Sequence, residues 1–456
     1  MSFDFFDNKE AADIIIINGR IYTQDPDLPW TEAAACRQGK ITAVGGSQEI
    51  LSLKEEGTDV LDLEGAYMLP GLIDTDGSPV TEVFEDSCLR LYDDMDTASV
   101  LDSVEFYASE HPEMKTVLAW GYDTGLEERN SSDDMKKRLD RISADRPVIL
   151  LSEDGMSAWM NTVCGNMAES AAAGDMAEIM TMPYLLSILD PFDCESMRDG
   201  IAFQTEKYSS RGYTAISNSG SPGFLSEAYN GIMASMIHDG SFRQRFYDSF
   251  SVSRKMNPRF VHARLTERRN LFTETSGLAA MRTLRIYAKN KSALSERYIR
   301  TLCSEAAASG CDIEISCDSR EILFCMCDII KNINKKYRKK LFFTFVHNEA
   351  LDDEERKNCF SEENISEAAS SAPDNRDPGE KIQALTLGAA EKLAVSRDLG
   401  SIEIGKCADF AVFEEDPLQK GRMPECIMTL IDGQIVYDAV NENMEEWYSV
   451  MSSQQF

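Results

Sequence analysis

Two carboxylates follow a short apolar run in the stretch YMLPGLIDTDGSPV, residues 67–80. Asp74 and Asp76 are two positions apart, and Asp154 lies further along, in the stretch SEDGM. Carboxylate oxygens are the ligands that Mg²⁺ and Ca²⁺ prefer, so these side chains could hold such an ion weakly. The simpler interpretation of Asp74 is a structural carboxylate at a strand end, which accepts hydrogen bonds from the backbone.

Nucleophilic catalysis is a second chemistry that the residue types allow. Ser78 or Ser316 could act as a nucleophile if His347 served as the base and Asp76 oriented it. The chain has only four histidines, which limits the choice of base. No nucleophile elbow, P-loop or dinucleotide-binding glycine motif accompanies these residues. The more ordinary interpretation is that neither serine is a nucleophile.

Four cysteines lie close together in the sequence, at Cys311, Cys317, Cys325 and Cys327. A thiolate metal site would need them on one face, but the last two are separated by one residue and fall in an expected helix. Neighbours at that spacing do not share a helix face. We therefore expect buried structural thiols.

Composition limits the possible partners. The chain has 456 residues, 43% of them hydrophobic, and a formal net charge of −32. A surface this acidic repels nucleic-acid phosphates and anionic lipid headgroups. The start, MSFDFFDNKE, does not resemble a signal peptide, and no apolar run is long enough to span a membrane. We expect a cytoplasmic protein with no nucleic-acid or membrane partner; the twelve scattered cysteines agree with a reducing compartment.

The two ends of the chain are alike. Near the start, two segments contain β-branched runs next to Asn-Gly or Gly-Lys, a pattern typical of hairpins. They are ADIIIINGRIYT (12–23) and GKITAVGG (39–46). Near the other end, CIMTLIDGQIVYD (426–438) contains an Asp-Gly tight turn. Such short strands need further partners, so we expect both ends to form one small β-sandwich domain.

The middle of the chain alternates apolar strand-like runs with helical stretches at the intervals of βα units. This alternation predicts a parallel sheet, and its closed form is the (β/α)8 barrel of the TIM type. Residues 80–210 fit the rhythm poorly, so we expect an inserted α/β subdomain there. The expected strands are YTAISNS (213–219), FYDSFSVS (246–253), LRIYAKN (284–290), DIEISCD (312–318) and LFFTFVH (341–347).

These segments resemble the amidohydrolase superfamily, in particular the amidohydrolase-3 branch that includes N-substituted formamide deformylases. The resemblance runs through nearly the whole chain in family order. It implies a metal-dependent barrel that hydrolyses amide or other C–N bonds, with divalent ions, usually zinc, at the carboxyl ends of its strands. The segments are ADIIIINGRIYT, DLEGAYMLPGLID (62–74), DRPVILLSEDGMSAWMN (145–161), GYTAISNSGS (212–221), LTLGAAEKL (385–393) and GSIEIGKCADFAVFEEDPL (400–418).

Most metal ligands that the resemblance implies are replaced in this chain. The His-x-His pair falls on Asp76 and Ser78, the carbamylated lysine on Arg285, and the fifth-strand histidine on Ser316. Only the sixth-strand histidine is kept, as His347. The terminal aspartate falls on Ser371, and an Asp-Gly-His triplet of the inserted region becomes Asp154, Gly155 and Met156.

Three functions remain open from the sequence. The first is a pseudoenzyme or altered-function protein with a degenerate metal site, which binds an unknown small molecule at the barrel mouth, where Arg285 could contact it. For it we expect no metal and no other cofactor. The second is an active metal-dependent C–N hydrolase built around Asp76 and His347. The third is a structural oligomerisation partner, and the resemblance suggests a homodimer.

The expected domain boundaries follow from this organisation. Residues 1–70 and 395–456 would form the composite β-sandwich domain. Residues 71–394 would form the barrel, with its insertion at about 80–210. The segment from His347 to Lys381 is short and polar. Either strands seven and eight are therefore shortened, as KNCFS (357–361) and EAASS (367–371), or the barrel is incomplete.

Overall fold

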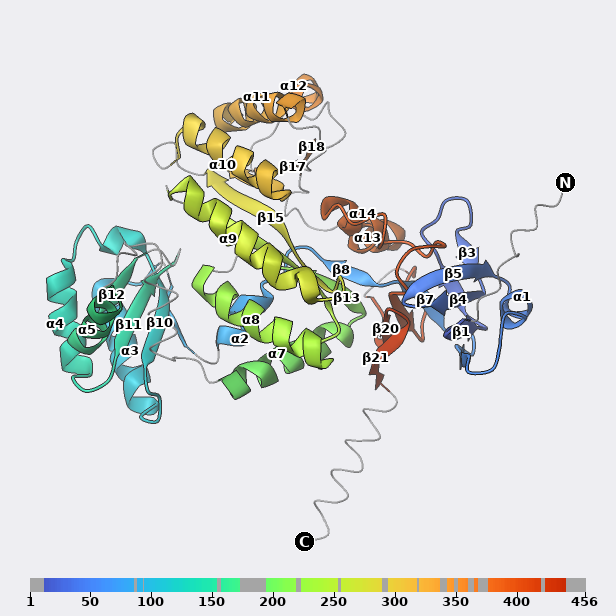
Figure 1. The fold of residues 1–456 in the computed structure, drawn as a ribbon, viewed down its shortest axis with the longest axis horizontal. Helices are drawn as coiled ribbons and strands as arrows, with labels where there is room; N and C mark the ends of the chain where they lie inside the picture. The colour runs from blue at the N-terminus through green and yellow to red at the C-terminus, as the bar shows by residue number, and fades with distance from the viewer. Residues whose placement is uncertain are drawn as a thin grey trace, which may run out of the picture.

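The protein is elongated and has three parts side by side along its long axis (Figure 1). Strands from both ends of the chain lie at one end, a half-open barrel lies in the centre, and an α/β subdomain lies at the other end. The computed structural model describes residues 12–85, 88–92, 94–153, 157–172, 194–218, 223–252, 256–288, 294–317, 320–336, 343–347, 352–359, 365–367, 376–419 and 423–439.

Two sheets form the end that contains both terminal segments. The first has the order β5-β4-β1-β6, and the second has the order β21-β20-β19-β7-β2-β3. Strand β19 pairs antiparallel with β7, so the two ends of the chain share a sheet. Whether they constitute a separate β-sandwich domain with the boundaries given above stays a prediction. The strands are β1 (Ile14–Ile17), β2 (Arg20–Tyr22), β3 (Trp30–Thr31), β4 (Ala33–Arg37), β5 (Lys40–Gly45), β6 (Asp59–Asp62), β7 (Tyr67–Pro70), β19 (Phe410–Phe413), β20 (Cys426–Ile431) and β21 (Gln434–Asp438).

The turn predictions at the two ends had different outcomes. The Asp432–Gly433 turn is confirmed, since Ile431 pairs with Gln434 across it. The Asn18–Gly19 hairpin is wrong, because β1 pairs with β4 and β6 whereas β2 pairs with β3 and β7. Asn18 adopts a positive φ of 55° and sends the chain from one sheet into the other instead of reversing it.

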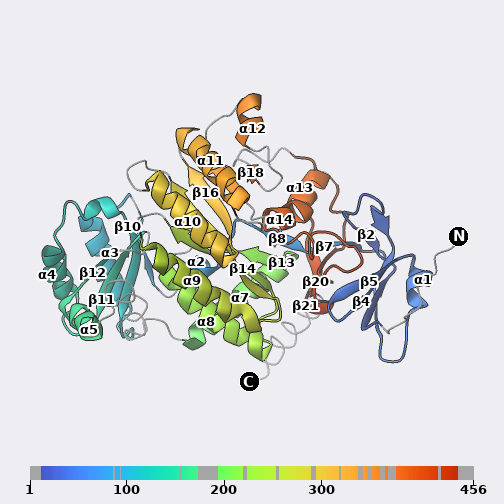
Figure 2. The ribbon, with the colours of Figure 1, turned by 45° about the horizontal axis from the view of Figure 1, so that its top comes forward.

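The central sheet has seven parallel strands in the order β18-β17-β16-β15-β14-β13-β8. It curves into a half-barrel, and helices pack along its outer face (Figure 2). The strands are β8 (Leu72–Asp74), β13 (Tyr213–Ser217), β14 (Arg245–Val252), β15 (Ala279–Ala288), β16 (Asp312–Cys317), β17 (Phe343–His347) and β18 (Ile365–Glu367). The helices between them are α2 (Pro79–Glu85), α7 (Cys194–Ser209), α8 (Gly223–Asp239), α9 (Pro258–Leu271), α10 (Glu296–Ser309) and α11 (Arg320–Lys336).

Helix α10 shows how the sequence sets these units. The Ser295 side chain accepts a hydrogen bond from the Tyr298 N–H and caps the first turn, and Gly310 ends the helix with a φ of 70°. Between these caps, Ile299, Leu302 and other apolar residues are buried against the barrel strands. Parallel strands joined by such helices are the pattern that the alternation predicted, and all five strands named there are present.

The segment after β17 differs from expectation. In the first of the two alternatives given above KNCFS forms a short strand, but Lys357–Cys359 belong to helix α12 (Asp353–Cys359). Its charged residues, Glu354, Glu355 and Arg356, are strong helix formers, which favours this outcome. A seventh strand is present as β18, and most of EAASS lies outside the described residues.

The remaining described elements complete the three parts. A four-stranded sheet with the order β12-β11-β10-β9 forms the subdomain between β8 and β13, at the place where the rhythm of βα units broke down. No helix in the described ranges is both long and apolar enough to cross a membrane. The elements are α1 (Ser47–Leu51), β9 (Leu89–Arg90), α3 (Thr97–Glu110), β10 (Val117–Tyr122), α4 (Ser132–Ile142), β11 (Val148–Ser152), β12 (Ala158–Met160), α5 (Thr162–Ala172), α13 (Pro378–Leu385) and α14 (Leu387–Lys392).

Candidate functional site

Asp74 is the last residue of β8, at the carboxyl end of the barrel sheet. Leu72 and Ile73 before it are buried, and its own side chain is half-buried. The Asp76 N–H donates to Asp74 Oδ1 at 2.9 Å, so the carboxylate organises the turn that follows the strand. Gly71 lets β8 approach β13, since a Cβ there would lie 2.1 Å from Thr214 Oγ1. The hydrogen bond from the Asp76 N–H agrees with the interpretation of Asp74 as a structural carboxylate at a strand end.

Asp76 forms an ion pair with a residue that is distant in the sequence. Lys392, at the end of α14, donates from Nζ to Asp76 Oδ1 and to Thr75 Oγ1, both at 3.1 Å. The Thr75 hydroxyl in turn donates to Asp76 Oδ2. The Lys392 side chain is 25% exposed, whereas that of Asp76 is 83% exposed, so solvent screens the pair.

A second ion pair lies between the neighbouring strands β15 and β16. Arg285 and Glu314 pair in register, and Arg285 Nη1 donates to Glu314 Oε1 at 2.8 Å. Both side chains are almost fully buried, at 8% and 11% exposed. Arg285 and Lys392 also line the same small space together with Glu314. Two cations thus lie close to Asp76 inside the carboxyl end of the half-barrel.

The two carboxyls have opposite electrostatic environments. Burial raises the pKa of Asp74 above its ordinary value, and the charges of Asp76 and Glu82 add to this shift. At Asp76, desolvation works against ionisation, but the Lys392 ammonium, the Thr75 hydroxyl and the Arg285 guanidinium outweigh it and lower the pKa. Carboxyl groups whose environments shift their pKa values in opposite directions are frequent at functional sites.

The other expected site residues are less fully described. Ser78 is half-buried and its carbonyl accepts the Glu82 N–H at the start of α2. Ser316 is buried in β16, where it pairs with Val346. His347 ends β17 in register with Cys317, and its side chain is outside the described part of the chain. Asp154 and Ser371 also lie outside the described residues.

Lys392 and Glu314 are the residues that the sequence analysis did not identify. The signal for Glu314 was an acidic residue in the middle of the apolar run DIEISC, one strand after the arginine in LRIYA. Lys392 is within the family-like segment LTLGAAEKL, but its partner is more than three hundred positions away. Only the fold brings these side chains together. Cys311, Cys317 and Cys327 are buried, as expected for core thiols.

The chain belongs to the amidohydrolase family, whose sequence profile matches residues 59–355. It is 28% identical over 171 residues to the exoenzymes regulatory protein AepA of Pectobacterium carotovorum subsp. carotovorum, covering 37% of each chain. It is also 28% identical over 161 residues to LONG AFTER FAR-RED 3 of Arabidopsis thaliana, covering 35% of this chain and 27% of that protein. The matches thus span 37% and 27% of the length of these two relatives.

Solved structures share the fold at low sequence identity. An uncharacterised metal-dependent hydrolase from Pyrococcus horikoshii aligns with a TM-score of 0.58 at 14% identity, over 89% of this chain and 98% of that one. An adenosine deaminase from Xanthomonas campestris with bound zinc aligns with a TM-score of 0.54 at 12% identity, over 97% and 99% of the two chains. These likenesses establish a TIM-type α/β barrel fold, of which the half-barrel described above is a part.

The expectation of no metal cofactor is wrong. The family and its metal-dependent structural neighbours, one of them with zinc, point to a divalent metal cofactor. The expectation failed because it counted missing imidazoles and gave little weight to carboxylates, although carboxylate oxygens alone can bind divalent ions.

The side chains at the barrel mouth fit some divalent ions better than others. The described residues contain no group of three or more His, Cys, Asp or Glu side chains arranged around a common point. They do place Asp74 and Asp76 so close that their charges repel, and a divalent cation would relieve this repulsion. Two carboxylates suit an oxygen-preferring ion that keeps several waters, such as Mg²⁺ or Mn²⁺. They do not make the set of three protein ligands that catalytic zinc takes.

Proposed function

We propose that the protein hydrolyses a C–N bond of a small molecule at the carboxyl end of its barrel strands, with a divalent metal cofactor. The observation that carries the proposal is the gathering of Asp74, Asp76, Lys392 and Arg285 at this edge. Enzymes with this barrel place their reacting groups at the same edge. Membership of the amidohydrolase family supports the reaction class.

The roles of the residues follow from their chemistry. Asp74 and Asp76 would hold the ion, which when bound supplies an activated water and polarises a carbonyl group. The Lys392 ammonium fixes Asp76 from the side of α14. The Arg285 guanidinium, held in place by Glu314, presents positive charge toward the same space, where it can stabilise a developing oxyanion.

The substrate class we propose is a small amide, with N-substituted formamides as the branch that the sequence resembles. Water adds to the carbonyl carbon, the C–N bond breaks, and the nitrogen leaves with a proton as an amine. A formamide would give formate and the amine. An acidic protein surface agrees with a neutral or cationic substrate. The cytoplasmic location and the homodimer stay predictions.

A second candidate is the pseudoenzyme, a protein that binds a small molecule at this mouth without turnover. The observation that favours it is the pairing of both site cations within the protein, Lys392 with Asp76 and Arg285 with Glu314. Because their charges are already neutralised by carboxylates, these two cations can position a ligand but stabilise the charge of a transition state only weakly.

The test is hydrolysis of N-benzylformamide, followed by the release of benzylamine, with Mg²⁺, Mn²⁺ or Zn²⁺ supplied in turn. We expect turnover that chelation abolishes and that the double variant D74N/D76N loses. The double variant D25N/D27N is the matched control, because Asp27 N–H donates to Asp25 Oδ1 at 2.9 Å in the same arrangement. Turnover that the D74N/D76N variant retains would exclude this site. Saturable binding of the formamide without turnover would support the second candidate.

A further inference from the structure

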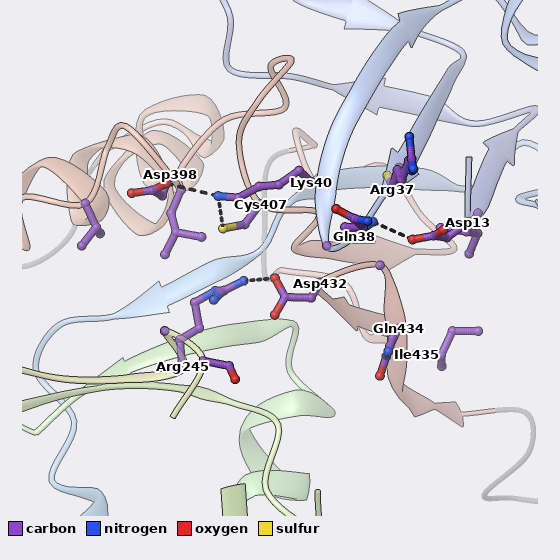
Figure 3. A pocket seen from close by; sticks show the side chains of 18 of the residues that line it. Asp13, Arg37, Gln38, Lys40, Arg245, Asp398, Cys407, Asp432, Gln434 and Ile435 are labelled. Carbon is purple, nitrogen blue, oxygen red and sulfur yellow. Dashed lines mark hydrogen bonds and ion pairs between the residues drawn. The ribbon is translucent and has the colours of Figure 1, made fainter. Parts of the chain in front are cut away.

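A cavity of about 1160 Å³ lies at the opposite end of the barrel strands from Asp74. One wall comes from the start of β14 and β15, including Arg245, Tyr247 and Arg282. The other wall comes from the turns at Gln38–Gly39 and Asp432–Gly433, in the sheets formed by the chain ends (Figure 3). The volume is large enough for a small organic ligand.

Figure 3 shows the side chains that line the cavity, and most of the charged ones are neutralised by partners within the protein. Arg245 forms a bidentate pair with Asp409, at 2.6 and 2.8 Å, and also donates to Asp432 at 2.5 Å. Lys40 Nζ donates to Asp398 Oδ1 and to Cys407 Sγ, each at 3.2 Å. These groups form a fixed polar frame with little net charge to offer a ligand.

Arg282 is different. Its Nε is buried without a hydrogen-bond partner. Among the described residues, its guanidinium has no carboxylate in ion-pair contact, and its Cζ lies 5.9 Å from the centroid of the Tyr247 ring. Arg282 is half-buried and lines the cavity, so an anion bound there would neutralise a charge that no described carboxylate neutralises. The cavity therefore contains a cation suited to an anion.

Apolar groups complete the lining. Tyr247, Val395 and Leu399 pack in or beside the apolar cluster under α14, and each faces this cavity. The carboxylate of Asp13, on the opposite wall, is engaged by the Gln38 N–H at 2.5 Å. Aromatic and aliphatic walls around a single unpaired guanidinium suit a ligand with an apolar body and one acidic group.

We propose that this cavity is a second ligand site, which binds an organic anion through a carboxylate or phosphate group held by Arg282. The guanidinium can donate two parallel hydrogen bonds to either group, while the ring of Tyr247 and the aliphatic side chains cover the body of the ligand. The site is independent of the proposed hydrolysis, since it lies at the other end of the strands.

The test compares matched ligands by isothermal titration calorimetry at constant ionic strength. Benzoate and phenyl phosphate carry the acidic group, and benzamide is the neutral counterpart of benzoate. We expect at least one of the two anions to bind with a Kd below about 10 mM and benzamide to bind at least about tenfold more weakly. The proposal is overturned if neither anion binds, or if benzamide binds as tightly as benzoate.

Two variants locate the binding. R282Q should weaken anion binding at least about tenfold, while R259Q, at an exposed arginine on α9, should leave it unchanged. Q434E places a negative charge at an exposed residue of the cavity rim and should also weaken binding, with no risk to the core. If R282Q does not fold, Q434E decides. The site is overturned if Q434E binds the anion as tightly as the wild type and R282Q either does the same or does not fold.

Discussion

The two ends of the barrel strands hold their charges in opposite ways. At the base, Arg245 and Asp409 are 6% and 3% exposed and form a bidentate pair that joins β14 to the strands of the chain's C-terminal end. At the mouth, Asp76 is 83% exposed and its partner Lys392 is 25% exposed. A desolvated pair is difficult to break, whereas a solvated pair exchanges partners readily.

This difference assigns separate tasks to the two ends. The base fixes the position of the barrel against the terminal sheets, because Arg245 contacts both Asp409 and Asp432. The mouth keeps Asp76 exposed and Asp74 half-buried, and a site for a metal ion and a substrate requires such access. If the proposed function is correct, we expect stability at one end and turnover at the other to change independently, and the following variants test that separation.

The largest effect on stability is expected from D409N at the base. The substitution leaves the buried Arg245 guanidinium with Asp432 as its remaining carboxylate, and breaking a buried pair typically costs about 3 kcal/mol. Urea denaturation should show this loss in the free energy of unfolding. The comparison fails if D409N unfolds at the wild-type urea concentration.

At the mouth, D74N/D76N should give the opposite result. Turnover of the formamide should fall by at least about a hundredfold, because general acid–base and metal-holding groups contribute on that scale. The free energy of unfolding should change by less than about 1 kcal/mol, since Asn keeps a carbonyl oxygen that can accept the backbone N–H. Loss of folding without selective loss of turnover would contradict the separation.

Removing the cation at the mouth sharpens the comparison. K392M deletes the partner of Asp76 and should cost less than about 1 kcal/mol of stability, because the pair is solvated. It should also strengthen binding of Mn²⁺ by up to about fivefold, since a competing positive charge is lost. Calorimetric titration with Mn²⁺ measures the change, and weaker Mn²⁺ binding in K392M would show that Lys392 supports the ion.

The smallest effect is expected at a surface pair that matches the base pair in length. Arg198 Nη2 and Asp239 Oδ2 are 2.6 Å apart, as are Arg245 Nε and Asp409 Oδ2, but the side chains are 37% and 44% exposed. The Ser241 hydroxyl and Arg198 lower the pKa of Asp239 to about 2. A lowered carboxyl pKa stabilises the fold above the unfolded pKa and ceases to do so as the pH falls through the folded one.

D239N should therefore be slightly less stable than the wild type at neutral pH. The difference should disappear as the pH falls from about 4 to 2, which thermal unfolding across this range can follow. A difference at neutral pH as large as that of D409N would mean that distance, and not burial, determines the strength of these pairs.

The sequence predicted the barrel strands well because alternating apolar runs and helices require little information from distant residues. The hairpin at Asn18 failed because pairing depends on partners far along the chain: β1 takes β4 and β6, and β2 takes β7. KNCFS failed because the helix propensity of the preceding charged residues extends into it.

The site could be predicted only in part. Asp74 and Asp76 were found because they follow an apolar strand, and Arg285 because of its place in a family-like segment. Lys392 could not be found in this way, since nothing near it in the sequence indicates that α14 returns to β8. The metal was wrongly excluded because the missing imidazoles were counted, whereas the family and its metal-dependent structural neighbours point to a divalent ion.

The most direct test of the account is the metal content of the protein after loading with Mn²⁺ and removal of excess ion by gel filtration. The account predicts about one ion per chain in the wild type and in D25N/D27N, and a clear loss in D74N/D76N. Equal metal content in the wild type and D74N/D76N, or a wild type that retains none, would contradict a metal site at the barrel mouth.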